Sequence, residues 1–148
     1  MPSTHLSLHF HIIFTPKHRR PDISAQWRAR LHAFLGGTVR RLDGIPEAVG
    51  GTADHVHLLL GLRATQNVAD VLRELKSASS RWIHATVGAR EFAWQDGYGA
   101  FTVSASKLAV VKRYIERQEE HHRRRTFQEE YVDFLKESGV EFDARYLW

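Results

Sequence analysis

The sequence contains no cysteine. This absence excludes disulfide frameworks, thiolate zinc sites and cysteine nucleophiles, so any bound metal has to be held by histidine, carboxylate or amide groups. The chain also lacks an apolar run of the roughly 18 residues that a membrane-spanning helix needs, and its first residues show no secretion signal. We therefore expect a cytoplasmic protein with no membrane partner.

What the chain does contain is typical of a folded domain. Its 148 residues suffice for one domain, and 43% of them are hydrophobic while 26% are charged. The formal net charge of +4 and the isoelectric point near 9.7 favour a polyanionic partner. The ten histidines are an unusual number for a chain of this length.

Two segments, residues 6–14 and 54–60, alternate between two kinds of side chain, as strands with two different faces do. One face of each segment is apolar, and the other carries imidazoles. These histidines are His9, His11, His55 and His57. If the apolar faces pack against helices, all four imidazoles lie on the opposite, open face of the sheet.

The rest of the sequence predicts further helices and strands, and their order along the chain indicates the fold. Helical spacing predicts helices at residues 22–42, 66–82, 107–124 and 126–135, and short strands are expected at 47–52 and 100–103. We expect a bend or bulge at Gly50 and Gly51. The order predicts an α+β, ferredoxin-like (RRM-like) fold with an antiparallel sheet and two helices on one face. Residues 1–124 form this domain, and residues 125–148 form a C-terminal helical extension of it.

A metal site and a nucleophile are possible on the open face. Two neutral imidazoles on one strand, His55 and His57, could hold a divalent cation, although they could equally be half-exposed histidines without a ligand. Gln118 could add an oxygen ligand or be an ordinary solvated glutamine. Tyr114, one helical turn earlier, could attack a metal-polarised phosphodiester and form a phosphotyrosine, or belong to the core. The competing candidates for the nucleophile lack a potential metal ligand one helical turn away in so ordered a context; they are Tyr98, Tyr131 and Tyr146.

Three segments together resemble a known family. They are the run from His11 to Pro21, Asp54-His-Val-His-Leu-Leu and Tyr114-Ile-Glu-Arg-Gln118. In this order they are similar to the single-tyrosine HUH transposases of small bacterial insertion sequences and to the REP-associated tyrosine transposases, over about residues 5–122.

The resemblance implies a homodimeric enzyme that cleaves and rejoins single-stranded DNA at hairpins marking the ends of mobile elements. It implies Mg²⁺ or Mn²⁺ as cofactor and no nucleotide cofactor. By position, His55 and His57 correspond to the two metal ligands, Gln118 to the third ligand and Tyr114 to the nucleophile that becomes joined to a 5′ phosphate. The catalytic helix is expected at the open sheet face. Whether Tyr114 completes the site of its own chain or of a partner is left open.

We expect DNA phosphates to contact a basic loop and the basic side of the second helix. These positions are Lys17, Arg19 and Arg20 in the loop and Arg73, Lys76 and Arg81 in the helix. His11 is interpreted as a substrate-side or packing residue. Trp94, Tyr98 and Phe101 could stack on bases or pack in the core.

Two other functions remain compatible with the sequence. One is a non-catalytic or domesticated protein that binds single-stranded DNA hairpins on the same fold. The other is a histidine-based metal-binding protein with no role in DNA chemistry. The extension at residues 125–148 could cover the core, extend the DNA contacts or support dimerisation.

Overall fold

Four strands form one antiparallel sheet in the order β2-β3-β1-β4. The structure is a computed structural model, and it describes residues 3–121 and 125–143. The strands are β1 (His9–Phe14), β2 (Ile45–Gly51), β3 (Val56–Gly61) and β4 (Gly99–Thr102). The helices are α1 (Ala25–Arg41), α2 (Val68–Trp82), α3 (Leu108–Glu116), α4 (Gln118–His121) and α5 (Phe127–Glu137).

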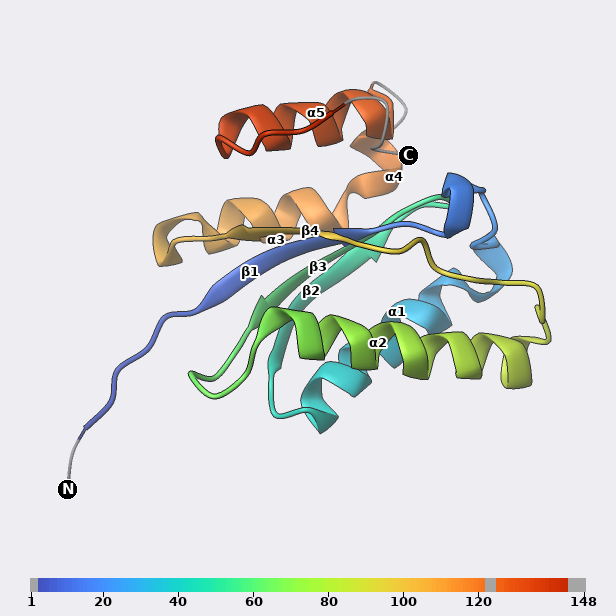
Figure 1. The fold of residues 1–148 in the computed structure, drawn as a ribbon, viewed down its shortest axis with the longest axis horizontal. Coiled ribbons are helices and arrows are strands. Elements are labelled where there is room, and N and C mark those ends of the chain that lie inside the picture. Colours follow the sequence, from blue (N-terminus) through green and yellow to red (C-terminus); the bar gives the residue numbers. More distant parts are fainter. Residues whose placement is uncertain (1–2, 122–124, 144–148) are drawn as a thin grey trace.

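The larger core lies between one face of the sheet and the helices α1 and α2 (Figure 1). Period-two alternation turns Ile12, Leu58 and Leu60 toward this layer, where they pack with apolar residues of α1 and α2 such as Leu31 and Leu72. The predicted α+β, ferredoxin-like arrangement with two helices on one face is thereby confirmed.

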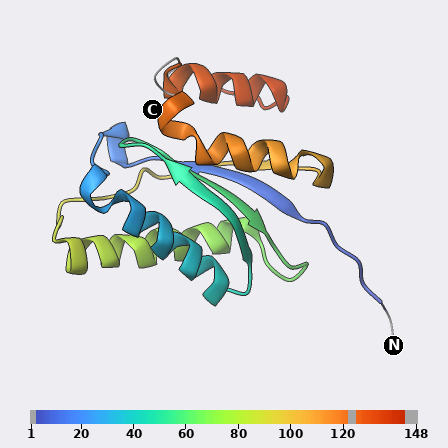
Figure 2. The same cartoon turned by 180° about the vertical axis from the view of Figure 1, so that it is seen from behind.

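The second face of the sheet carries the predicted catalytic helix, as expected, but it is not left free for a ligand, because α5 also lies over it. Figures 1 and 2 show α3 and α5 on the side of the sheet opposite to α1 and α2. A smaller apolar cluster joins this face to α3 through Leu59 and Ile115. The backbone of α3 approaches closely because Gly50 has no side chain: a Cβ there would lie 2.1 Å from the carbonyl oxygen of Ile115.

Several predicted boundaries need correction. The first strand begins at His9 and not at Leu6, because Leu6 and Leu8 extend beyond the sheet and are 55% and 36% exposed. The predicted bulge lies between Pro46 and Ala48 and not at the glycine pair. The helix expected over 107–124 is interrupted at Arg117, whose backbone angles are not helical.

The predicted C-terminal helix is present as α5. Its N-cap is Thr126, whose side chain accepts a hydrogen bond from the backbone N–H of Glu129, as the sequence pattern indicated. Residues 122–124 and the tail from 144, including Tyr146, lie outside the described residues. Within residues 3–121 and 125–143, no helix has the length and apolar character needed to cross a membrane.

Candidate functional site

The predicted histidine pair lies in the layer between the sheet and the C-terminal helices. His55 immediately precedes β3 and His57 lies within it, and their side chains are 1% and 0% exposed. His11 lies on the neighbouring strand β1, and its Nε2 is 2.8 Å from Nδ1 of His57. Burial, followed by the nearby His57, lowers the pKa of His11 to about 3, so this imidazole is neutral. His9 instead contacts Glu47 at 3.1 Å.

The surroundings of His55 determine which of its ring nitrogens is available. Nδ1 lies 2.7 Å from a carboxylate oxygen of Asp54. Burial would raise the pKa of Asp54, but hydrogen bonds, the one from His55 foremost, hold it below its ordinary value. An ionised carboxylate only accepts hydrogen bonds, so Nδ1 carries the proton, and in neutral His55 the lone pair is on Nε2.

Gln118 presents an oxygen to that lone pair. Its amide nitrogen donates to the carbonyl oxygen of Tyr114 at 3.1 Å, which turns Oε1 toward Nε2 of His55 at 3.0 Å. A ring nitrogen lone pair and an amide oxygen repel each other unless a proton or a metal cation lies between them. The donor set at this position therefore fits a divalent cation.

Tyr114 lies on α3 beside this pair. The centroid of its ring is 5.7 Å from that of His57 in the same chain, and its hydroxyl oxygen is buried. Burial raises the pKa of the Tyr114 phenol above its ordinary value, and the neighbouring carboxylate of Glu130 raises it further. The structure thus brings together all four side chains that the sequence singled out: His55, His57, Tyr114 and Gln118.

Helix α5 adds three residues to the site that sequence reasoning missed. A carboxylate oxygen of Glu130 lies 3.1 Å from Nε2 of His57. The ring of Phe127 stacks on His55 with centroids 4.5 Å apart, and Phe134 packs edge-on against His11 with centroids 5.0 Å apart. The sequence carried a signal for these residues. Positions 127, 130 and 134 share one helix face, and a glutamate among apolar positions on such a face is unusual.

The imidazoles and carboxylates of the site do not share one point at which a metal ion would be held. Within the described part of the chain, no three histidine, cysteine, aspartate or glutamate side chains converge on a common point. The ring centroids of His55 and His57 are 5.1 Å apart, and each ring faces its own oxygen, from Gln118 or Glu130. The site consists of two nitrogen–oxygen pairs side by side.

The predicted DNA contacts are distributed over different surfaces. Lys17 and Arg20 are exposed beside the end of β1, and Arg19 is half-buried there. Arg73 and Arg81 are exposed on α2, and this helix lies on the far side of the sheet from α3, which carries Tyr114 (Figure 1).

Three of the residues considered for DNA contacts are engaged within the protein. The ammonium group of Lys76 donates to the carbonyl oxygens of Gln95 and Gly97 and so ties α2 to that loop. His11 is 2% exposed, so the structure supports its packing interpretation. Trp94 is buried against Phe14 and belongs to the core.

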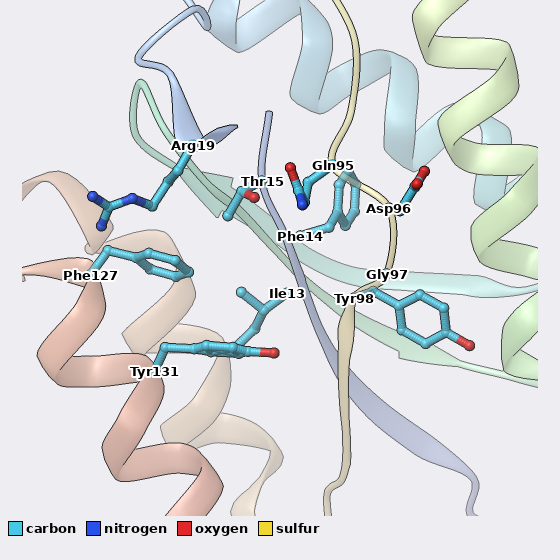
Figure 3. A pocket seen from close by; sticks show the side chains of 10 residues that line it. All are labelled: Ile13, Phe14, Thr15, Arg19, Gln95, Asp96, Gly97, Tyr98, Phe127 and Tyr131. Atoms are coloured by element: carbon cyan, nitrogen blue, oxygen red, sulfur yellow. The ribbon is translucent and has the colours of Figure 1, made fainter. Parts of the chain in front are cut away.

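A cavity lies at the end of β1, next to the histidine layer. Figure 3 shows Phe127 and Tyr131 projecting from α5 on one side, with Arg19 beside them, and Tyr98 on the opposite side. The phenols of Tyr98 and Tyr131 thus line a different cavity from the one that Tyr114 lines.

Comparisons with known proteins identify a family for this chain and structures of similar fold. A family model described as "Transposase IS200 like" matches residues 4–118. The fold is similar to a crystal structure from Deinococcus radiodurans R1, provisionally described as a transposase, with a TM-score of 0.62 and 24% identity over 80% of this chain and 96% of that one. It is also similar to a REP-associated tyrosine transposase bound to a REP hairpin, with a TM-score of 0.60 and 16% identity over 82% of this chain and 74% of that one. No curated protein sequence matches.

Proposed function

Since this chain belongs to the IS200-like transposase family, we propose that it cleaves and rejoins single-stranded DNA at hairpins, with Tyr114 as the nucleophile. The observation that carries the proposal is the placement of Tyr114 beside His57, with Gln118 linking the α3 backbone to His55. A similar fold has been solved with a REP hairpin, which makes DNA hairpins the first substrates to examine.

The proposed reaction exchanges one phosphodiester for another. The phenolic oxygen of Tyr114 attacks phosphorus, an O–P bond to the 5′ phosphate forms, and the P–O3′ bond breaks. The phenol loses one proton, and the departing 3′ oxygen gains one. Attack by a 3′ hydroxyl on the phosphotyrosine reverses these changes and rejoins a strand, so no nucleotide cofactor is required.

His55, His57 and the amide oxygen of Gln118 are the residues that would hold Mg²⁺ or Mn²⁺ in this proposal. The chemistry that such a cation supplies is electrostatic stabilisation of charge on the phosphate oxygens. Asp54 positions His55 by accepting a hydrogen bond from its Nδ1–H, which leaves Nε2 directed toward Gln118. The raised pKa of Tyr114 means that the phenol needs help from its surroundings to lose its proton.

The DNA strand would approach through a surface cavity that Tyr114 and Glu130 line together. Because the hydroxyl of Tyr114 is buried, side chains around this cavity have to move before phosphorus reaches it. The exposed cations Lys17 and Arg20 beside the end of β1 are proposed to hold phosphates of the same strand.

The decisive experiment detects the covalent intermediate. The protein is incubated with Mn²⁺ and labelled hairpins copied from the imperfect palindromes nearest to its gene. We expect a denaturant-resistant protein–DNA adduct that is lost in Tyr114→Phe and retained in Tyr131→Phe, which removes a hydroxyl from a neighbouring helix.

Each other result has a definite meaning. An adduct that persists in Tyr114→Phe would refute the assignment of the nucleophile. Tight hairpin binding without any adduct would favour the alternative function, a non-catalytic DNA-binding protein. Absence of both would contradict the proposal.

A further inference from the structure

Glu130 is a buried carboxylate that the proposed function does not use. It lies on α5, beyond residues 4–118 that the family model matches, and it is only 3% exposed. Removing a carboxylate from water costs several kcal/mol unless a positive charge or hydrogen bonds compensate it. Nε2 of His57 at 3.1 Å and a hydrogen bond with the phenol of Tyr114 already compensate part of this cost, and a divalent cation in the same pocket would compensate more.

The geometry around Glu130 repeats the geometry around Gln118. Nε2 of His57 faces a Glu130 oxygen at 3.1 Å, and Nε2 of His55 faces a Gln118 oxygen at 3.0 Å. In an octahedral site with metal–ligand bonds of about 2.1 Å, adjacent ligand atoms lie about 3.0 Å apart. Both nitrogen–oxygen pairs thus already have the separation of neighbouring ligands.

The charges at the site also favour a cation beside Glu130. His55, His57 and Gln118 bring no negative charge when they act as ligands, whereas Mg²⁺ and Mn²⁺ prefer sites that include carboxylate oxygen. The cavity beside Tyr114 is lined by three carboxylates and one guanidinium, from Glu130, Asp133, Glu137 and Arg125. DNA phosphate would be repelled from such a cavity unless a cation offsets the excess negative charge.

We infer that Glu130 is a further, anionic ligand of the divalent cation, supplied by the C-terminal helix to the pocket of His55, His57 and Gln118. The two nitrogen–oxygen pairs stand side by side, so binding draws them toward one ion. Helix α5 thereby contributes to the metal site as well as covering the sheet. This inference rests on the proposed function, because it concerns the same cation.

The test measures binding of Mn²⁺ alone to the full chain by calorimetry, without DNA. We expect Glu130→Gln, which keeps the side-chain volume, to weaken Mn²⁺ affinity at least about tenfold. Glu129→Gln is the matched control, because Glu129 is 60% exposed on the same helix and its loss removes the same charge. Glu130→Asp keeps the charge and should bind more tightly than Glu130→Gln.

Failure of the inference and failure of the proposed function give different results. If His57→Ala abolishes Mn²⁺ binding while Glu130→Gln binds as tightly as wild type or more tightly, Glu130 is not a ligand and the histidine site stands. If wild type itself does not bind Mn²⁺, the proposed metal-dependent function is contradicted. Thermal unfolding of each variant without metal shows that the affinities belong to folded protein.

Discussion

Burial alters the acid–base chemistry of single histidines in this protein. His32 on α1 is half-buried, and burial, followed by the nearby guanidinium of Arg28, lowers its pKa to about 4. The unfolded chain protonates His32 near pH 6.5, so below that pH the unfolded state binds more protons than the folded state. Stability contributed by neutral His32 is complete above pH 6.5 and is lost as the pH falls toward 4.

A substitution at this position tests the effect. Between pH 6.5 and 4, we expect the unfolding free energy of His32→Gln to fall less than that of wild type. The difference between the two losses should reach up to about 3 kcal/mol. Urea unfolding at several pH values measures the difference. If the two proteins lose stability in parallel over this range, His32 does not titrate as its surroundings indicate.

At the scale of elements, the position of α3 depends on one glycine. A Cβ at Gly50 would lie 2.1 Å from the carbonyl oxygen of Ile115, a backbone atom that moves only if the helix moves. Tyr114 is the neighbour of Ile115, so the same contact sets how closely Tyr114 lies to the sheet.

We expect Gly50→Ala to destabilise the protein by about 1–3 kcal/mol, because it overpacks the contact between α3 and the sheet. Gly37→Ala is the control: it lies in α1 with no atom within 4 Å of the added Cβ, and alanine there should stabilise by about 0.5–1 kcal/mol. Denaturant midpoints measure both. A Gly50→Ala protein as stable as wild type would show that α3 packs less closely against the sheet.

At the scale of the whole molecule, the structure places Tyr114 beside the histidine pair of the same chain. The rings of Tyr114 and His57 lie 5.7 Å apart without a second subunit. We therefore expect Tyr114→Phe and His57→Ala, co-expressed with different tags, to give no hairpin adduct together. Recovered adduct formation would show instead that the site is shared between two chains. The homodimer stays a prediction, which the mass of the protein in solution checks.

The sequence determined most of the fold, because alternation and helical spacing are local properties of the chain. It also singled out His55, His57, Tyr114 and Gln118, since position along a strand or helix decides the face on which a side chain lies. The roles of these residues still rest on the proposed experiments.

Only the tertiary structure decided that α5 lies over the second face of the sheet beside α3 and that Glu130 lies against His57. Those contacts join residues far apart in the sequence, and local spacing carries no information about which helix packs over which strand. The sequence predicted a DNA contact for Lys76, and the structure shows that its ammonium group also donates to the carbonyl oxygens of Gln95 and Gly97. Helical spacing could not reveal this contact, because the loop lies beside Lys76 only in the folded chain.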